Sequence, residues 1–277
     1  MNKRLIGFCL AALVVLAAAP ALRGQFLPDE IAERAQWEEF LRTADIIAEE
    51  QLIGRESVTS PWKLTFKKGD VVHHALWKNA KGRMSGFIEG WQFEIGAYLI
   101  DKLLDLNRIP PTVERRFHEN RGSCQLWIEG CLSLKQKEEQ KIRTPPVHIL
   151  AWNRNTFLQR AFDNLLANED RHMNQVLITQ PDWRMILIDH SRSFRTSKKF
   201  TKELIFSAKH PEGPKLMKEL PRAFVEKLKG LTFETIRTTV GEYLSDEEIN
   251  AVLIRRDLIL AEVDRLIKEN GEDKVLY

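Results

Sequence analysis

The sequence predicts an α+β protein with two lobes, a β-rich first half and a mainly helical second half. Apolar and polar residues alternate over Trp62–Phe66, and a second strand-like run, Val71–Lys78, follows a Lys68-Gly69-Asp70 turn, which is typical of a β-hairpin. After Pro145 most apolar residues recur at helical spacing. The 277 residues suffice for one large domain or two smaller lobes.

Composition excludes several classes of protein and argues against one class of partner. With 43% hydrophobic and 29% charged residues, the chain is neither disordered nor collagen-like, and it is not a small disulfide scaffold. The formal charge of +3 resides in the first 24 residues, which hold Lys3, Arg4 and Arg23 and no acid. The rest of the chain has 39 basic and 39 acidic residues. This balance gives no electrostatic reason to expect nucleic acid as a partner.

The first 24 residues have the pattern of a signal peptide. Lys3 and Arg4 precede an uncharged apolar run, Leu5–Ala19, and Ala19-Pro20-Ala21 offers a small-x-small cleavage site. The pattern predicts export to a periplasm, a secretory lumen or the medium. The alternative is an uncleaved membrane anchor, because Leu5–Leu22 is near the shortest length that spans a bilayer. A membrane is an expected partner in that case alone.

Changes of periodicity divide the remaining chain into three segments. Residues 25–55 are expected to form an N-terminal helical extension, because apolar residues recur at roughly helical spacing over Pro28–Glu50. Residues 56–130 are expected to form the β-rich lobe and residues 131–277 the mainly helical lobe.

Within the β-rich lobe, the hairpin is followed by a loop containing glycine and then a helix predicted over Trp91–Leu106. Two further strands are expected at Ile109–Val113 and Cys124–Ile128, around a turn at 120–122. Cys124 and Cys131 permit one disulfide in an exported chain, although both positions also suit small apolar core residues.

In the helical lobe, the sequence predicts three helices and a second hairpin. A proline at 145 or 146 opens the first helix, a second lies between Pro221 and Gly230, and a Ser245/Glu248 capping box begins a long third helix. The hairpin consists of two short β-rich runs, Val176–Ile178 and Met185–Ile188.

The mouth of this second hairpin is the expected chemical site. Asn174 precedes its first strand and Asp189 follows its second, and such ends lie side by side in an antiparallel pair. An amide oxygen beside a carboxylate suits Mg²⁺ or Mn²⁺, with phosphate oxygens and water completing the shell. Asp170, just upstream, could accept a proton from a hydroxyl. The structural alternative is that Asp170 pairs with Arg171 and that Asn174 caps a turn.

Asp170-Arg171-His172 with Asn174, followed by Ile188-Asp189 and Phe194, resembles the catalytic and metal-binding loops of the atypical kinases. This group includes phosphoinositide 3/4-kinases, HipA-type kinases and the secretory-pathway kinases that phosphorylate exported proteins and proteoglycan sugar. The resemblance implies a two-lobed protein-kinase-like fold with a β-rich N-lobe and a mainly helical C-lobe. It also implies an ATP-dependent phosphotransferase that uses Mg²⁺ or Mn²⁺ and acts on a hydroxyl-bearing protein, lipid or sugar.

The resemblance assigns a role to each matching residue. Lys78 would hold the nucleotide phosphates, Glu94 would position Lys78, and Ile128 would lie on the strand leading to the adenine-binding hinge. Asn174 and Asp189 would bind the metal ion, Asp170 would orient or deprotonate the acceptor hydroxyl, and His172 would stabilise the transferring phosphoryl group. The glycine pattern G-x-G-x-x-G is absent before Lys78, and Gly54 is the single glycine in Ile53–Pro61.

Two other functions fit parts of the same pattern. Asp170, His172, Asp189 and His190 could form a metal-dependent phosphoesterase, which would leave Lys78 and Glu94 without a role. A non-catalytic pseudokinase that serves as a binding module is the other alternative, because ATP is scarce outside the cell interior.

Overall fold

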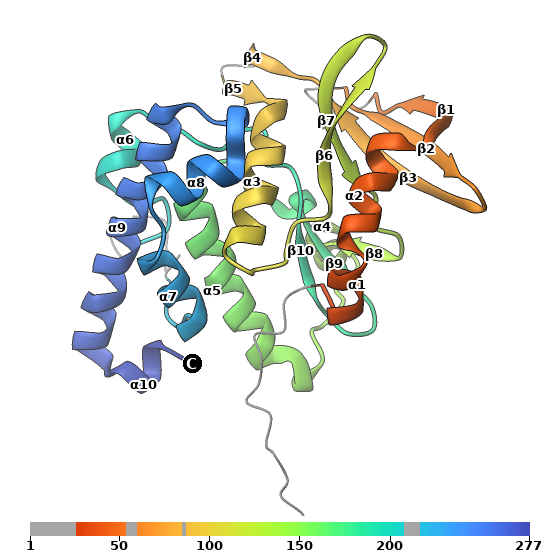
Figure 1. Ribbon diagram of the computed structural model, residues 1–277. Helices are drawn as coiled ribbons and strands as arrows, with labels where there is room; N and C mark the ends of the chain where they lie inside the picture. The colour runs from red at the N-terminus through yellow and green to blue at the C-terminus, as the bar shows by residue number, and fades with distance from the viewer. Residues whose placement is uncertain (1–25, 54–59, 85–86, 208–216) are drawn as a thin grey trace, which may run out of the picture.

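The computed structural model describes residues 26–53, 60–84, 87–207 and 217–277. A sheet-rich part and a helical part flank helix α3 (Trp91–Leu103), as Figure 1 shows. This arrangement confirms the predicted two-lobed α+β fold. The predicted signal peptide lies outside the described residues, and the lobe boundaries at 56 and 131 stay predictions. Within the described ranges, no helix combines the length and the apolar character that crossing a membrane requires.

The sheet-rich part is built on five antiparallel strands in the order β1-β2-β3-β7-β6. Alternation along the predicted hairpin places Leu64, Phe66, Ala75 and Trp77 in its core. Helix α2 packs on the same core through Phe40 and Leu41. The strands and helices of this part are β1 (Asp45–Gln51), β2 (Trp62–Lys68), β3 (Val71–Lys78), β6 (Thr112–Phe117), β7 (Asn120–Leu126), α1 (Pro28–Ala32) and α2 (Arg34–Thr43).

The helix predicted over Pro28–Glu50 is wrong in its second half. Helix α2 ends at Thr43, Ala44 is extended, and Asp45–Gln51 forms the edge strand β1 against β2. The apolar residues of this stretch fit both periodicities over a short window, and pairing with β2 decides between them. The segment expected to be a helical extension therefore contributes a strand to the main sheet.

The turn predicted at 120–122 lies two residues earlier. His118 and Glu119 adopt left-handed backbone conformations with φ of 45° and 62°, whereas Gly122 lies inside β7. A Cβ atom at Gly122 would come within 2.4 Å of the Lys78 carbonyl oxygen. Glycine at 122 thus lets β7 lie close to β3, whereas the chain reverses at His118 and Glu119.

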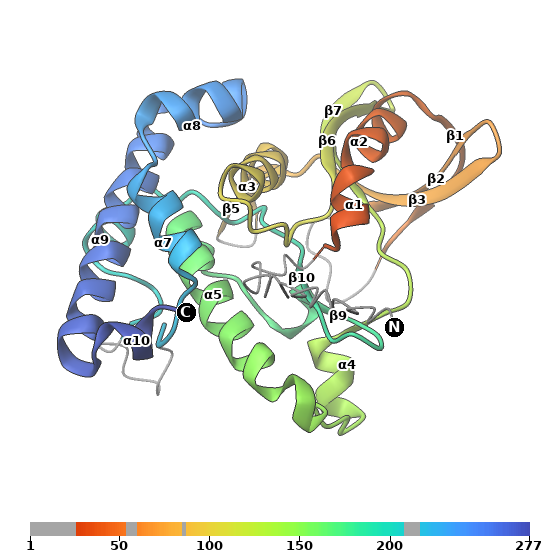
Figure 2. The same cartoon turned by 60° about the horizontal axis from the view of Figure 1, so that its bottom comes forward.

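Helix α3 follows a hairpin that the sequence analysis treated as a loop. Strands β4 (Lys81–Met84) and β5 (Phe87–Gly90) form this two-stranded sheet. Nine of the 13 residues of α3 are buried, because the helix packs against β6 and β7 on one side and α8 (Phe233–Val240) on the other. Figure 2 shows α3 between the sheet and the helical part.

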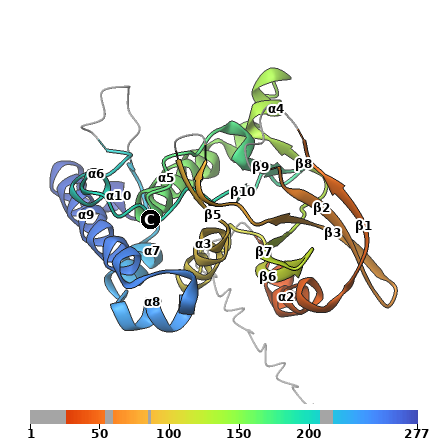
Figure 3. The same cartoon turned by 90° about the horizontal axis from the view of Figure 1, so that it is seen from above.

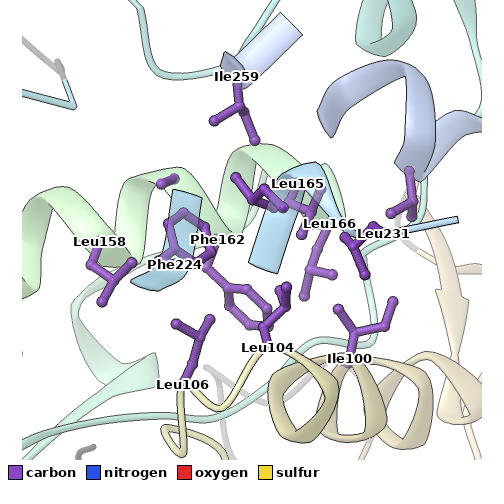
Figure 4. Packing of buried hydrophobic residues seen from close by; sticks show 14 of the residues in the cluster. Ile100, Leu104, Leu106, Leu158, Phe162, Leu165, Leu166, Phe224, Leu231 and Ile259 are labelled. Carbon is purple, nitrogen blue, oxygen red and sulfur yellow. The ribbon is translucent and has the colours of Figure 1, made fainter. Parts of the chain in front are cut away.

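The helical part packs around α5 and α9, which confirms the predicted helices there. Ser245 accepts a hydrogen bond from the Glu248 amide at the start of α9, as the capping box predicted. Figure 4 shows Phe162 and Leu165 of α5 facing Ile100 and Leu104. The helices are α5 (Ile149–Leu166), α6 (Lys198–Lys202), α7 (Arg222–Lys229), α8 (Phe233–Val240), α9 (Asp246–Asn270) and α10 (Glu272–Val275).

A three-stranded sheet of order β10-β9-β8 lies beside α4 (Leu134–Glu139) and carries the predicted second hairpin (Figure 3). Its strands are β8 (Cys131–Ser133), β9 (Val176–Thr179) and β10 (Met185–Leu187). The register pairs Leu187 with Val176, so the ends that precede Asp189 and follow Asn174 are adjacent. Cys124 and Cys131 are free thiols, and burial raises the pKa of Cys124 to about 12.

Candidate active site

A cleft of about 750 Å³ contains most of the predicted site residues. Its walls come from the ends of β1 and β3, from β5, from the loop before β9 and from the segment that follows β10. The predicted residues that line it are Lys78, Asp170, His172, Asn174 and Asp189. Glu94 lies buried beside Lys78. The structure therefore brings together groups that are more than 100 positions apart in the chain.

Lys78 is the last residue of β3 and joins the two sides of the cleft. Its Nζ donates to Glu94 Oε1 in the first turn of α3 and to Asp189 Oδ1 beyond β10, both at 2.8 Å. The Lys78 side chain is 8% exposed and that of Glu94 is 3% exposed. A buried ammonium group of this kind depends on its carboxylate partners.

The three charges shift one another's titration. Burial would lower the pKa of Lys78, but the attraction of Asp189 and Glu94 is stronger and raises it. Burial would likewise raise the pKa of Asp189, but Lys78 and the Ser191 hydroxyl hold it well below its usual range. Lys78 and Asp189 are thus both charged at neutral pH. Burial raises the pKa of Glu94, against the attraction of Lys78.

Asp189 occupies a special backbone position. It follows β10 with a φ of 60°, a left-handed conformation that aspartate tolerates better than most residues. Its Oδ1 also accepts a bond from Ser191 Oγ at 3.1 Å, and its Oδ2 accepts one from Gln175 Nε2 at 3.2 Å. Gln175 was not among the predicted site residues, although it follows Asn174 directly and lies at the same hairpin mouth.

Asn174 and Asp189 are the cleft residues that could support a metal ion. Among the described residues, no group of three or more His, Cys, Asp or Glu side chains could hold a metal ion. Asn174 lines the cleft with Asp189 and offers an amide oxygen beside one carboxylate, whereas the Gln175 oxygen accepts a hydrogen bond from the His172 N–H at 3.3 Å. Such a hard but incomplete donor set fits Mg²⁺ or Mn²⁺ when phosphate oxygens complete the shell.

The loop that carries Asp170 is anchored by a buried ion pair that the sequence analysis did not foresee. Arg171 pairs with the fully buried Asp163 of α5 at 3.0 Å, so the alternative pairing of Arg171 with Asp170 is wrong. Arg171 Nη1 also donates to the Ile188 carbonyl at 2.6 Å. This arginine thereby ties the loop to the strand end that precedes Asp189.

His190 belongs to the same buried network. Its Nε2 lies 2.8 Å from Arg171 Nη2 and accepts a hydrogen bond from that guanidinium. Burial and the Arg171 charge lower the pKa of His190 well below its usual value, so the imidazole is neutral. The His190 backbone N–H donates to Glu94 Oε2 at 2.8 Å. Glu94 therefore contacts both Lys78 and the chain that follows Asp189.

The remaining predicted residues differ in how closely they approach this cluster. Asp170 Oδ2 forms an ion pair with Arg192 Nη1 at 3.0 Å, and its side chain is 30% exposed. His172 is exposed at the edge of the cleft. Ile128 packs against the core of the sheet, while its neighbour Trp127 lines the cleft. The adenine-side role of Ile128 stays a prediction.

Comparison with known proteins places this geometry in a known fold. No protein-family model matches the chain, and a search of curated proteins finds no match. Among solved structures, the chain is similar to a hydra Fam20 with sugar, at 14% identity and a TM-score of 0.64 over 93% of this chain and 95% of that one. It is also similar to a Golgi casein kinase, at 14% identity and a TM-score of 0.62 over 89% of this chain and 79% of that one. The same kinase with Mn/ADP bound gives equal values.

The chain has a kinase-like fold. At this level of identity the likeness concerns the fold alone, and it extends over nearly the whole chain rather than one lobe. The resemblance read from the sequence is therefore confirmed as an atypical kinase-like architecture. Its lipid-kinase and HipA-type branches receive no separate support.

Proposed function

We propose that the protein is an exported atypical kinase, which transfers a phosphoryl group from ATP to a hydroxyl group of a protein, lipid or sugar. The observation that carries the proposal is the pair of 2.8 Å bonds from Lys78 Nζ to Glu94 and Asp189. They lie in a cleft that also contains Asp170. Phosphoryl transfer needs little covalent chemistry from the protein, but it needs charge neutralised on the phosphates and an acceptor held in line.

The residues that the sequence predicted for the site have definite tasks in this reaction. Lys78 holds the phosphates of ATP, and Glu94 keeps its ammonium group in place. Asp170 accepts the proton of the acceptor hydroxyl as the new bond forms between the acceptor oxygen and the γ-phosphorus. The bond from that phosphorus to the β,γ-bridging oxygen breaks, and ADP leaves. His172, at the edge of the cleft, stabilises the transferring group.

Asp189 and Asn174 are the proposed ligands of Mg²⁺ or Mn²⁺, and the Gln175 side-chain amide donates to Asp189 Oδ2 beside them. When bound, the ion supplies positive charge against the phosphates. The similar Golgi casein kinase structure contains Mn and ADP, which supports the binding of a divalent ion and a nucleotide here. Likewise, the secretory setting of a Golgi kinase supports the export that the N-terminal pattern predicts.

The phosphoesterase alternative loses one of its four groups. His190 is buried, and its accepting nitrogen Nε2 is engaged by Arg171. A metal ligand needs that lone pair. This alternative also leaves unexplained the buried ion pair of Lys78 with Glu94.

A nucleotide titration beside a transfer assay tests the proposal and separates it from the pseudokinase. ATP with Mg²⁺ or Mn²⁺ should bind, and radiolabelled phosphate should appear on protein, lipid or sugar acceptors. Lys78→Ala should weaken nucleotide binding, transfer or both. Binding without transfer to any acceptor would favour the pseudokinase, and absence of nucleotide binding would contradict the kinase.

A further inference from the structure

Arg192 joins two carboxylates at one end of the cleft. Its Nε contacts Glu89 Oε1 at 2.5 Å, and its Nη1 contacts Asp170 Oδ2 at 3.0 Å. The Arg192 side chain is 12% exposed. All three residues line the cleft that contains Lys78 and Asp189. None of the tasks assigned above uses Arg192 or Glu89.

Glu89 makes the position of this guanidinium fixed rather than incidental. The Glu89 side chain is 1% exposed, and Arg192 is its ion-pair partner. A buried carboxylate without a counter-ion is strongly destabilising, so Glu89 holds Arg192 in place. The Phe87 ring packs against the guanidinium, with 4.3 Å from Cζ to the ring centroid. Arginine has the planar fork of donors that two carboxylates in different directions require.

Two hydrogen bonds fasten β5 to the segment that follows Asp189. The Gly90 N–H donates to the Ser191 carbonyl at 2.9 Å, and Arg195 Nη1 donates to the Ile88 carbonyl at 2.8 Å. Arg192 lies between these two contacts in sequence. The chain is therefore held in place on both sides of Arg192.

Asp170, by contrast, is part of a loop and is partly exposed. Arg192 forms an ion pair with its Oδ2, and no hydrogen bond or ion pair between described residues uses Oδ1. A general base must present one oxygen to the proton it accepts, within hydrogen-bond reach. With Oδ2 held by Arg192, Oδ1 is the oxygen that remains for the acceptor hydroxyl.

We propose that Arg192 is the positioning residue of the transfer step, and that it orients the carboxylate of Asp170 through a guanidinium fixed by Glu89. This inference rests on the proposed kinase function for its kinetic consequence, but the contact itself can be tested without turnover. On this proposal, the β4–β5 hairpin holds the general base Asp170 in position through Glu89 and Arg192.

The kinetic test compares three variants. Arg192→Gln should lower kcat roughly 10- to 100-fold, because a small misplacement of a reacting group has this scale of effect, while the KM for ATP stays within about twofold. Arg192→Lys should recover part of the rate, since one ammonium group replaces one of the two contacts. Arg184→Gln is the matched control, because Arg184 also bridges two carboxylates, Glu30 and Asp182, away from the cleft.

Hydrogen exchange tests the contact in the protein without nucleotide. Arg192→Gln should speed amide exchange in residues 168–174, and Arg184→Gln should leave it unchanged. If Arg192→Gln does not fold because Glu89 is left unpaired, the double variant Glu89→Gln/Arg192→Gln removes both charges and takes its place. Unchanged exchange in these residues, or equal loss of kcat in the Arg184 control, would overturn the proposal. If the wild-type protein transfers no phosphate but Arg192→Gln still speeds exchange in residues 168–174, the kinase function is contradicted and the contact is supported.

Discussion

In the proposed reaction, Lys78 neutralises charge on the phosphates, whereas Asp170 orients and deprotonates the acceptor. Lys78 is buried between two carboxylates, and its strongly favoured positive charge faces the cleft. Asp170 is 30% exposed and meets Arg192 instead of Lys78. The structure therefore separates the residue that attracts phosphate from the residue that handles the acceptor, and substitutions at the two positions should have different kinetic effects.

Asp170→Asn should leave nucleotide affinity nearly intact and reduce transfer roughly 10²–10⁴-fold, the usual scale for a lost general base. Asparagine keeps the size of the side chain and an oxygen for Arg192, but it cannot accept the hydroxyl proton. Nucleotide titration and a transfer assay on the same variant measure both quantities. Full transfer activity would remove Asp170 from this role, and His172 would be the next residue to substitute.

The metal assignment predicts unequal effects at Asp189 and Asn174. Asp189→Asn should weaken Mn²⁺ binding in the presence of ADP roughly tenfold or more, because ligand charge largely sets affinity for hard cations. Asn174→Ala should have a smaller effect, because the amide oxygen that it removes carries no formal charge. Calorimetric titration measures each affinity, and cooperative thermal unfolding serves as the control for folding. Unchanged affinity in both Asp189→Asn and Asn174→Ala would contradict the assignment.

At the scale of elements, the sequence predicted local pairings better than partners from distant segments. The second hairpin follows from two β-rich runs and a polar turn, so the approach of the two sides of the site could be predicted. Strand β1 could not be predicted in this way, because its strand conformation depends on pairing with β2, which lies further along the chain. Asp163 and Arg192 were missed for a related reason. Their partners, Arg171 and Glu89, are set by tertiary packing that no local spacing encodes.

The connection from α3 to β6 depends on a buried carboxylate near the end of the helix. Asp101 is fully buried, and its side chain accepts bonds from the backbone N–H groups of Arg108 and Ile109. Burial raises the pKa of Asp101 to about 7. Because this value lies above the unfolded value of about 3.9, the protonated acid is the form that favours folding. Its contribution is full below about pH 4 and is lost as the pH rises through 7.

Raising the pH from 5.5 to 8 should therefore lower the free energy of unfolding of the wild type by roughly 2 kcal/mol relative to Asp101→Asn. Asparagine stays neutral and keeps an oxygen for the Arg108 and Ile109 amides, so the variant lacks this titration. Urea unfolding of both proteins at several pH values measures the difference. Parallel stability curves would show that Asp101 has the same pKa in the folded and unfolded states.

On the scale of the whole molecule, residues 26–44 connect parts that are distant in the chain. The Phe26 N–H donates to the Asn107 carbonyl after α3, and Glu30 pairs with Arg184 in the β9–β10 turn. Arg115 of β6 donates to the carbonyls of residues 41, 42 and 44 at the end of α2. This segment thus contacts the main sheet, the small sheet and the α3 region together, as the position of α1 and α2 in Figures 1 and 2 illustrates.

Glu38 of α2 contacts helix α3, which carries Glu94 of the candidate site. Its Oε1 accepts bonds from Tyr98 Oη at 2.5 Å and Lys102 Nζ at 2.6 Å. Tyr98 lies one helical turn after Glu94 on α3, so the two side chains share a face of that helix. Burial would raise the pKa of Glu38, but the Lys102 and Tyr98 bonds outweigh it and lower that pKa. The carboxylate is therefore ionised at neutral pH.

Glu38→Gln should lower the free energy of unfolding by about 1–3 kcal/mol, because Tyr98 and Lys102 lose a charged acceptor in a partly buried site. It should also weaken nucleotide binding several-fold, since α3 positions Glu94 and hence Lys78. Arg42→Gln is the matched control: Arg42 lies 3.7 Å from the same carboxylate but is 49% exposed, and such surface pairs contribute little. Urea unfolding and nucleotide titration on both variants separate the two effects. Lower stability with unchanged nucleotide affinity would mean that α2 supports the fold without setting the position of α3, and the coupling between this segment and the cleft would be wrong.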